Sequence, residues 1–535
     1  MTVDTGATRR TLESHDPPAR NWRGLGWGFV VKLLVMGVVN ALGLTIILAA
    51  WNTESWAILV VSAVLLIAAD VVYFTNRAMP LKYILPGLIF LFIFQIFTLG
   101  YTGYVAFTNY GTGHAGSLDQ AVDAALIQDE RRAENSPTYP LAVVQDGDEV
   151  GFAISDPDGF LLVGTEETPL EVVDGGAVNE SGVPTSVPGW EIVPRAQLFT
   201  DQDLQSRVIE LRVPVSDDAE DGSIRTREGS SGAVYTSSLV WDSDAQTLTN
   251  TETGTVYEAA DTGNFVAADG SQLPAGWTVT VGFDNFVRAV TDATLAGPLL
   301  KVTLWTFAFA LLTVLSAFGL GLLFAILYND PRIRARKWLR TLFILPYAFP
   351  AFMSALLFRG MFNREFGVVN DWFFFGADIN WLGDPLLAKV VILWVNLWLS
   401  YPYWFLVCTG ALQALSTETQ EAARIDGASR WRQFRSITLP LLMVSTAPLA
   451  IASFAFNFNN FTIIYMLTEG GPPFAGTSGL GSSDILISAI YKISGVAGGV
   501  ADYGLASALS IVVFVVVGVI SAIAFRQTRK LEEIQ

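Results

Sequence analysis

Long uncharged apolar runs recur along this chain and constrain its fold more than any other feature. A helix needs about 20 apolar residues to cross the hydrocarbon core of a bilayer. Runs of that order are Leu33–Thr53, Ser55–Asn76, Tyr83–Asn109, Val302–Asn329, Thr341–Phe358, Val390–Thr417, Ser436–Thr468 and Tyr503–Phe525, and only Asp70 interrupts one of them. The first run is too long and starts too late for a cleaved signal peptide. We therefore predict an all-α polytopic membrane protein with eight transmembrane helices.

The distribution of basic residues predicts the orientation. Lys and Arg favour the cytoplasmic side of short connections. If the N-terminus is inside, the alternate segments 1–32, 77–82, 329–340, 415–440 and 526–535 together hold 19 basic and 9 acidic residues. An even number of spans returns the C-terminus to the same side. We predict a multi-pass protein of the cytoplasmic membrane with both termini inside.

The polar interval 108–290 has a different composition from the rest of the chain. It holds 31 Asp or Glu, eight Arg and no Lys, so the net charge of −18 arises there. Alternating patterns predict strands at Gly151–Leu162, Val208–Val215, Thr247–Tyr257 and Thr278–Val281, and Asp-Gly turns separate such stretches. We predict an inserted β-rich extracytoplasmic domain. The predicted organisation is 1–107 (tail and three spans), 108–290 (outer domain) and 291–535 (five spans with a cytoplasmic loop at 415–440).

Composition and missing motifs exclude several function classes. The single cysteine, Cys408, cannot form an intramolecular disulfide, and with two histidines the chain cannot build a His/Cys metal site. The acidic total argues against a nucleic-acid partner. The sequence contains no G-x-x-x-x-G-K-[ST] motif, and its spans hold no nucleophile–base pair or carboxylate dyad. We expect no catalytic residues, no metal and no cofactor, so any ATP would be bound by another polypeptide.

One short segment before the seventh run carries a regular spacing. It contains Glu421-Ala422-Ala423, then Gly427 after three residues, and then Ile437, Leu439 and Pro440. Ser416 or Thr417 can cap a short helix over 416–425, Gly427 permits a sharp turn, and Pro440 suits the first turn of the following helix. A protruding knob and an ordinary capped loop both fit these residues.

This spacing resembles the EAA-x3-G-x9-I-x-L-P signature of membrane subunits of type I ABC importers. Eight helices with a large insertion after the third resemble the MalF-type permeases of maltose/maltodextrin importers. Similar stretches are 344–348, 398–403, 451–461 and 468–472. The resemblance is detailed over roughly 280–535 and only architectural before that. It implies a cytoplasmic ABC ATPase dimer that binds ATP and grips the knob, a second permease subunit of MalG type and an extracytoplasmic sugar-binding protein. It assigns the ATPase coupling role to Glu421, Ala422, Ala423, Gly427, Ile437, Leu439 and Pro440.

The polar groups within the later spans are mostly neutral amides, which match the hydroxyl groups of a neutral sugar. Successive residues of a helix are 100° apart, so one helix face holds Phe456, Asn457 and Asn460. On the preceding apolar run, one face holds Asn396, Ser400 and Tyr403, with Leu399 beside it, and Trp398 points elsewhere. The resemblance implies substrate contacts at Tyr347, Asn396, Trp398, Leu399, Ser400, Tyr403, Phe456, Asn457 and Asn460. Ala351 stands where the family has a serine. Alternatively, the asparagines bridge helices.

The prediction is therefore a permease for maltose/maltodextrin-like oligosaccharides. Trehalose or another α-glucoside is the alternative cargo. An ion-coupled secondary sugar transporter and a membrane-anchored outer enzyme are the alternatives from other classes, although the spans lack the ionisable residues that the former needs.

Overall fold

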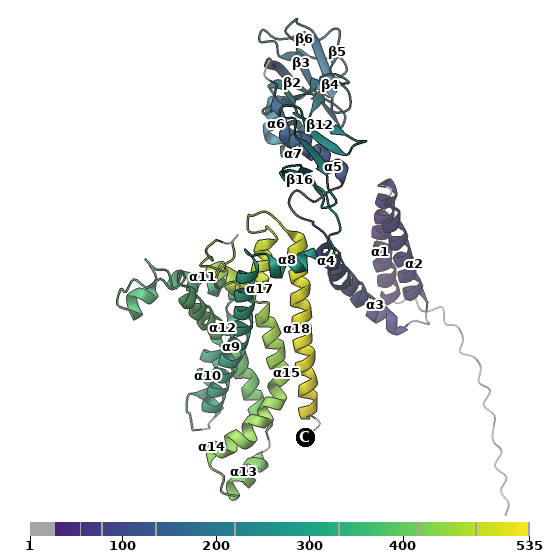
Figure 1. Cartoon of the computed structure of the whole chain (residues 1–535). Helices are drawn as coiled ribbons and strands as arrows, with labels where there is room; N and C mark the ends of the chain where they lie inside the picture. The colour runs from purple at the N-terminus through teal and green to yellow at the C-terminus, as the bar shows by residue number, and fades with distance from the viewer. Residues whose placement is uncertain are drawn as a thin grey trace, which may run out of the picture. The chain divides into compact units, whose positions relative to one another are not determined.

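The computed structural model describes residues 27–53, 55–75, 79–133, 136–218, 221–329, 332–415, 417–476 and 479–532 (Figure 1). The chain divides into two compact units, residues 1–101 and 102–535. Several basic residues used to predict the orientation, among them Arg9, Arg10, Arg20, Arg23 and Arg77, lie outside the described residues.

The first unit is helical. It comprises α1 (Trp27–Asn52), α2 (Trp56–Phe74), α3 (Met79–Leu91), the π-helical turn η1 (Phe92–Phe97) and the start of α4 (Thr98–Ala106). The amide of Asn40 on α1 donates a 2.9 Å hydrogen bond to the carboxylate of Asp70 on α2. The acid inside the second apolar run therefore has a polar partner, as a carboxyl group at membrane depth requires.

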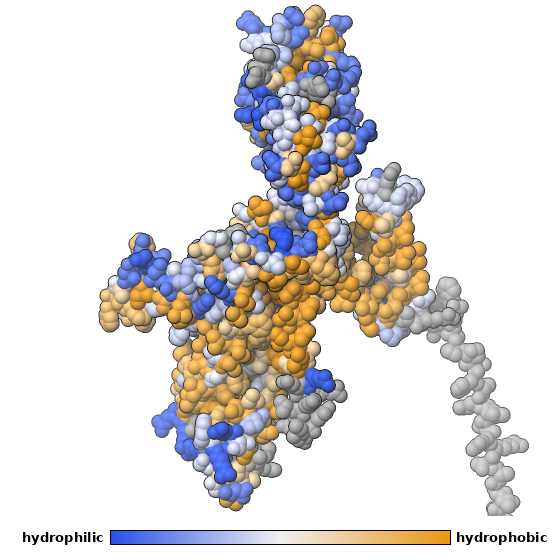
Figure 2. Space-filling model, in the orientation of Figure 1, coloured by the Kyte–Doolittle hydropathy of each residue, from blue (hydrophilic) through white to orange (hydrophobic). Residues whose placement is uncertain are grey.

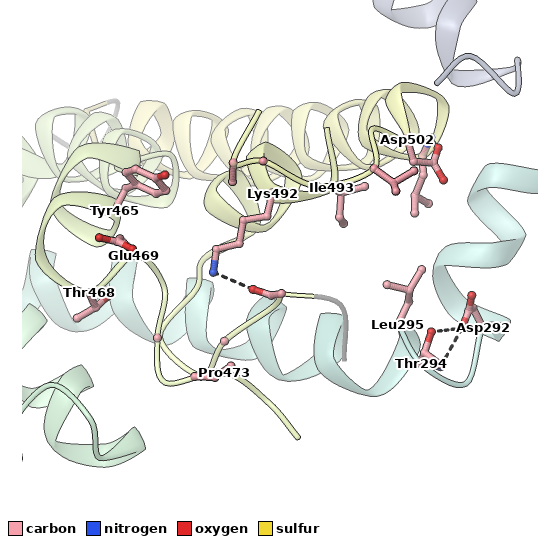
Figure 3. A pocket seen from close by; sticks show the side chains of 18 of the residues that line it. Asp292, Thr294, Leu295, Tyr465, Thr468, Glu469, Pro473, Lys492, Ile493 and Asp502 are labelled. Carbon is pink, nitrogen blue, oxygen red and sulfur yellow. Dashed lines mark hydrogen bonds between the residues drawn. The ribbon is translucent and has the colours of Figure 1, made fainter. Parts of the chain in front are cut away.

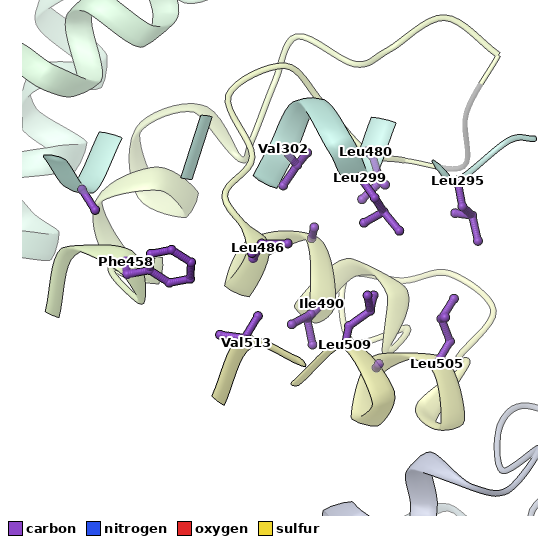
Figure 4. Packing of buried hydrophobic residues seen from close by; sticks show 13 residues of the cluster. Leu295, Leu299, Val302, Phe458, Leu480, Leu486, Ile490, Leu505, Leu509 and Val513 are labelled. Atoms are coloured by element: carbon purple, nitrogen blue, oxygen red, sulfur yellow. The ribbon is translucent and has the colours of Figure 1, made fainter. Parts of the chain in front are cut away.

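The helices of the second unit pack around a long central helix, α9. They are α8 (Asp284–Thr291), α9 (Ala296–Asn329), α10 (Arg336–Ile344), η3 (Leu345–Ala348), α11 (Ala351–Met361), η4 (Val369–Phe373), α12 (Pro385–Ala414), α13 (Thr417–Ile425), α14 (Arg430–Gln433), η5 (Phe434–Thr438), α15 (Leu439–Phe458), α16 (Phe461–Thr468), α17 (Leu486–Ile493) and α18 (Tyr503–Glu532). One buried cluster joins Leu299 of α9 to Leu486 of α17 and Leu509 of α18 (Figure 4). Hydrophobic residues cover the visible sides of these helices, as lipid contact requires (Figure 2).

The described residues contain seven helices long and apolar enough to span a membrane, or eight if one bent pair counts as a span. That pair corrects the fifth predicted run, Thr341–Phe358: the segments 336–348 and 351–361 meet at 92°. Pro350 lies at the bend, and a proline has no N–H with which to continue a helix.

The seventh predicted run, Ser436–Thr468, was wrong at both limits. The helical span starts at Arg430, because Ser429 caps it, and it ends at Phe458. Asn459 and Asn460 separate α15 from α16.

The interval 108–283 folds into a β-rich domain, with hydrophilic residues prominent on its visible face (Figure 2). Its elements are α5 (Leu118–Asp129), β1 (Arg131–Arg132), β2 (Tyr139–Asp146), β3 (Glu149–Ser155), β4 (Leu161–Thr165), β5 (Glu171–Val172), β6 (Ala177–Val178), β7 (Pro184–Ser186), β8 (Glu191–Ile192), α6 (Arg195–Thr200), α7 (Gln202–Glu210), β9 (Val213–Pro214), β10 (Ser223–Thr226), β11 (Ser231–Thr236), β12 (Leu239–Asp242), β13 (Thr247–Asn250), β14 (Val256–Ala259), β15 (Asn264–Ala267) and β16 (Gln272–Gly276).

Two antiparallel sheets dominate this domain. The order β5-β4-β3-β2-β11-β10-β9 forms the larger sheet, with β1 and β8 attached, and β12 to β16 form a meander. Side chains of β2, β3 and β10 pack against α6 and α7, with Phe152, Val213 and Ile224 fully buried. A second core, around Leu248 and Phe265, lies between the meander and α5.

The predicted strands are confirmed in part. Gly151–Leu162 and Thr247–Tyr257 each contain a turn and parts of two paired strands, β3 with β4 and β13 with β14. Val208–Val215 was wrong over its first three residues, because α7, which Asp201 caps, continues to Glu210; the strand β9 occupies only Val213–Pro214 of the predicted stretch. In Thr278–Val281 the structure has only an isolated bridge, from Thr280 to Thr108.

Helices α9 and α12 approach each other closely at Gly321. A Cβ atom added there would lie 2.6 Å from the Cβ of Trp404 and 2.7 Å from the backbone nitrogen of Phe405. Gly319, two residues earlier on α9, has no atom within 4 Å of the same construction. Of the two glycines, only Gly321 is therefore required for the contact between α9 and α12. Small residues are typical of positions where membrane helices pack closely.

We predict that Gly321→Ala lowers the free energy of unfolding by about 1–3 kcal/mol, because the added methyl group overpacks the α9–α12 contact. Gly319→Ala is the matched control and should be neutral or slightly stabilising, since alanine favours the helix. The measurement is the apparent melting temperature of the purified protein in detergent. Equal melting temperatures for the two variants would contradict the close approach.

Candidate functional site

A cavity of about 600 Å³ lies among η3, α12, α15 and α16. Eight of the nine predicted substrate contacts line it: Tyr347, Asn396, Leu399, Ser400, Tyr403, Phe456, Asn457 and Asn460. They come from η3, α12, α15 and the break that follows α15, so segments far apart in sequence meet at the cavity. The described residues that line the cavity include no Asp, Glu, Lys, Arg or His. The site is therefore polar but uncharged.

Trp398 is the predicted contact that does not line this cavity. Its ring packs edge-on against Phe358, with centroids 5.3 Å apart, and against Phe349 at 6.1 Å. Phe349 does line the cavity. Trp398 thus packs against the cavity residue Phe349 without lining the cavity itself. This agrees with the expectation that Trp398 points away from the helix face of Asn396 and Ser400.

The buried amides form a hydrogen-bonded chain across three helices. Asn396 on α12 donates to the hydroxyl of Thr313 on α9 at 3.1 Å and to the amide oxygen of Asn457 on α15 at 2.8 Å. Asn460 donates to the oxygen of Asn396 at 3.5 Å. Asn457 donates to the carbonyl of Ser453 at 2.8 Å. Asn396 and Asn457 therefore bridge helices, as the alternative interpretation expected, while they also form the cavity wall.

Other polar groups of the wall have unused hydrogen-bonding capacity. The hydroxyls of Tyr347, Ser400 and Tyr403 make no hydrogen bond to another described residue. The rings of Tyr347 and Phe456 are 58% and 71% exposed, which leaves their faces open to the cavity. Hydroxyl groups beside flat aromatic faces suit a ligand with polar edges and an apolar C–H face.

Two helix breaks give the cavity its shape. The 3-10 turn η3 that carries Tyr347 contains Pro346, and Pro350 lies between it and α11. Asn460 was predicted to share a regular helix face with Phe456; instead it follows the end of α15 and still lines the cavity. Sequence reasoning missed Ser453 and Thr462. Ser453 lies one helical turn before Asn457 and was accessible to that reasoning, whereas Thr462 lies beyond the unpredicted break.

A second, larger cavity of about 920 Å³ lies among α8, α16, α17 and the loops that follow them (Figure 3). It contains none of the predicted substrate contacts. Four of its charged side chains form ion pairs: Arg288 with Asp502 at 2.8 Å, Glu469 with Arg359 at 2.7 Å, and Lys492 with the buried carboxylate of Asp484 at 2.8 Å. The smaller, neutral cavity is the better candidate for an uncharged ligand.

The segment with the regular spacing forms a helix and a tight turn. Helix α13 begins at Thr417, and Ser416, the alternative cap, lies outside the described residues. Glu421 and Ala422 are exposed and Ala423 is buried. Gly427 adopts φ +76°, a left-handed conformation that favours glycine.

The remaining residues of the pattern lie on the helix that follows. Ile437 lies within the π-helical turn η5, and Leu439 and Pro440 are the first two residues of α15. Because η5 runs directly into α15, the knob is joined to the wall of the cavity by one helical span, Arg430–Phe458.

Two family models match the chain. One, described as "Binding-protein-dependent transport system inner membrane component", matches residues 317–532. The other, described as "N-terminal of TM subunit in PBP-dependent ABC transporters", matches residues 89–167. Both models describe membrane subunits of binding-protein-dependent transporters.

Curated relatives match almost the whole chain. The maltose/maltodextrin transport system permease protein MalF of Vibrio vulnificus (strain YJ016) is 34% identical over 513 residues, covering 93% of this chain and 95% of the relative. MalF of Escherichia coli (strain K12) is 33% identical over 519 residues, covering 93% and 96%. Among solved structures, a chain of a bacterial alginate ABC transporter in complex with an alginate pentasaccharide-bound periplasmic protein matches with a TM-score of 0.41 and 25% identity, over 47% of this chain and 83% of that chain.

We predict that Asn396→Ala lowers the free energy of unfolding by about 1–2 kcal/mol, because it removes the bridge between Thr313 and Asn457. Ser400→Ala, on the same wall and without a protein partner, should change it by less than about 0.5 kcal/mol. Thermal unfolding in detergent provides the measurement. If both variants unfold like the parent protein, the amide chain does not hold these helices together.

Proposed function

This chain belongs to the MalF family of maltose/maltodextrin permeases, and from that premise we propose that it carries maltose/maltodextrin-like oligosaccharides across the cytoplasmic membrane in an ATP-driven importer. The observation that supports this most is the neutral cavity of about 600 Å³ with its open hydroxyls and aromatic faces. That volume lies within the usual range for sites that hold small organic ligands.

The proposed substrate contacts divide into two groups. The first group forms hydrogen bonds to the sugar hydroxyls and consists of Tyr347, Ser400, Tyr403 and Asn460. The ring face of Phe456 contacts the apolar face of the sugar. The second group supports the wall: Asn396 and Asn457 join its helices through their hydrogen bond. Leu399 adds an apolar contact. Trp398 packs against Phe349 on the side away from the cavity. Trehalose or another α-glucoside remains the alternative substrate, because the exposed Ala351 lines the cavity where the family has a serine.

The knob formed by α13 and Gly427 is proposed to dock on a cytoplasmic ABC ATPase dimer. In this proposal Glu421 and Ala422 make the contact, Ala423 packs the short helix, and Gly427 sets the turn. Ile437, Leu439 and Pro440 start the helix that transmits the motion. The chain itself binds no ATP and needs no cofactor; a second permease subunit of MalG type completes the pathway.

Both termini are proposed to lie in the cytoplasm, with 108–290 as an extracytoplasmic domain between the membrane regions 1–107 and 291–535. An external sugar-binding protein delivers the substrate on that side. Ion-coupled transport is less well supported, since the cavity wall offers no carboxylate or basic group to bind the ion.

Substitutions at Gly427 test the coupling role. Gly427→Val should reduce sugar-stimulated ATP hydrolysis and uptake at least about tenfold, because a β-branched residue is strained at positive φ. Gly427→Asn should retain much of the activity, since asparagine tolerates the left-handed conformation. Both are measured in proteoliposomes with the assembled complex, after equal membrane insertion is verified. Normal uptake with Gly427→Val would refute the coupling role.

The sugar preference can be tested at Ala351. Ala351→Ser adds a hydroxyl to the wall and should raise the apparent affinity for maltose by about fivefold, the value of one hydrogen bond of about 1 kcal/mol. The measurement is ATPase stimulation with a panel of maltose, maltotriose, trehalose and a non-glucosidic disaccharide. Ala351→Val is the control for size. Equal stimulation by every sugar would reject the proposed substrate class and leave the coupling test unaffected.

A further inference from the structure

An aromatic cluster protrudes from the segment 363–381 between α11 and α12, named here the aromatic loop. Four of its side chains are largely exposed: Phe366 by 82%, Trp372 by 75%, Phe373 by 68% and Phe375 by 94%. Isolated exposed apolar residues are common, but a contiguous exposed apolar patch marks an interaction surface. The neutral cavity and the knob do not include these residues, so the patch requires a separate explanation.

The aromatic loop is held together by polar contacts at its base. The buried Asn370 donates to the carbonyls of Arg364 at 3.1 Å and Ile379 at 3.0 Å, and it accepts from the indole of Trp381 at 2.7 Å. Arg364 and Asp378 form two parallel hydrogen bonds, of 2.6 and 2.7 Å. The guanidinium group holds the pKa of the Asp378 carboxyl below its usual value. The exposed rings are therefore presented by a preorganised loop.

The backbone at the tip directs one ring outward. Phe375 adopts φ +55° and Gly376 follows at φ +80°. The N–H of Gly376 donates to the carbonyl of Asn370 at 2.8 Å. A bulky residue rarely occupies the left-handed region, and such a conformation persists only where the surrounding structure imposes it. The result is the most exposed aromatic side chain of the four.

The attachment points place the aromatic loop at the end of membrane helices. It follows Met361, the last residue of α11, and leads to Pro385, the first residue of the spanning helix α12. In Figure 2 the projection beside α11, at the left, has hydrophilic residues on its upper side and hydrophobic residues on its lower side. Trp and Tyr concentrate at this level of membrane proteins, and Trp372 is one of the four exposed residues, while the Phe rings add apolar surface that can enter the upper acyl chains.

We propose that the aromatic loop is a membrane-interface anchor whose Phe366, Trp372, Phe373 and Phe375 side chains insert among the lipid headgroups and upper acyl chains. The Arg364–Asp378 pair remains on the aqueous side and closes the base. The anchor fixes the depth of α11 in the bilayer, and α11 begins at the cavity residue Ala351. The proposal depends on the chain spanning a membrane and is independent of the identity of the sugar.

Site-specific fluorescence tests the anchor. In a Cys408→Ala background, Phe375→Cys and, separately, Phe366→Cys are labelled with the environment-sensitive dye NBD, and the full chain is placed in lipid nanodiscs. Nitroxide groups are attached to the lipids at the headgroup, the upper acyl chain or the bilayer centre. We expect headgroup and upper-chain nitroxides to quench both labels at least about threefold more than central nitroxides do, as an interfacial position requires.

Phe160→Cys is the matched control, because Phe160 is a 56% exposed aromatic residue on a turn of the β-rich domain. Its label should show little quenching by any lipid nitroxide. Each variant is first required to elute as a monodisperse protein, and the measurement is repeated with the partner subunits bound. Quenching at 375 and 366 no stronger than at 160 would overturn the proposal. So would quenching that disappears on assembly, since a protein partner would then be the occupant.

Discussion

The need to satisfy every backbone polar group within hydrocarbon determines where this chain can interrupt its helices. Two interruptions occur in the second unit, at Phe349–Pro350 and at Asn459–Asn460. Both border the same cavity, whose polar wall and ligand space can compensate for the lost helical hydrogen bonds. Within the described residues of the second unit, these two breaks thus lie beside the candidate binding site. Asn396 and Asn457 line the cavity from the regular helices α12 and α15, whereas Asn460 lines it from the second break.

The amide chain through Asn396 connects stability with the site. Asn396 uses both of its N–H groups on Thr313 and Asn457 and accepts from Asn460. With its donors occupied, it positions the wall and has little capacity left for a ligand. Family resemblance alone could not separate such a positioning residue from a contacting one, because both line the cavity. The hydrogen bonds of each side chain separate the two kinds of residue. The donors of Asn396 are occupied, whereas the hydroxyls of Ser400 and Tyr403 are available to a ligand.

Sequence reasoning succeeded where a periodic pattern was long and failed at local interruptions. Apolar runs located the spans, and the β-rich domain was recognised from alternation and Asp-Gly turns. The 92° bend after η3 could not be predicted from the apolar run Thr341–Phe358, because a proline such as Pro350 permits a kink without fixing its angle. Val208–Val215 alternates like a strand, but the cap at Asp201 extends a helix into it. Helical geometry placed Asn460 on one face with Phe456, but Asn460 lies after the end of α15, so that geometry does not apply to it. The resemblance also assigned Asn460 to the substrate contacts, and Asn460 does line the cavity.

The same span that bears Asn457 begins beside the knob, and this continuity has a mechanical consequence. Arg430–Phe458 contains 29 residues, which at 1.5 Å per residue extends over about 43 Å. The side chain of Ser429 caps its first turn, and Gly427 sets the angle between it and α13. A displacement imposed on α13 would therefore act at one end of a continuous helical span whose other end holds Phe456 and Asn457. Because Asn457 is hydrogen-bonded to Asn396, movement of α15 must either carry α12 with it or break that bond. The buried amide thus links motion at the knob to the arrangement of the cavity wall.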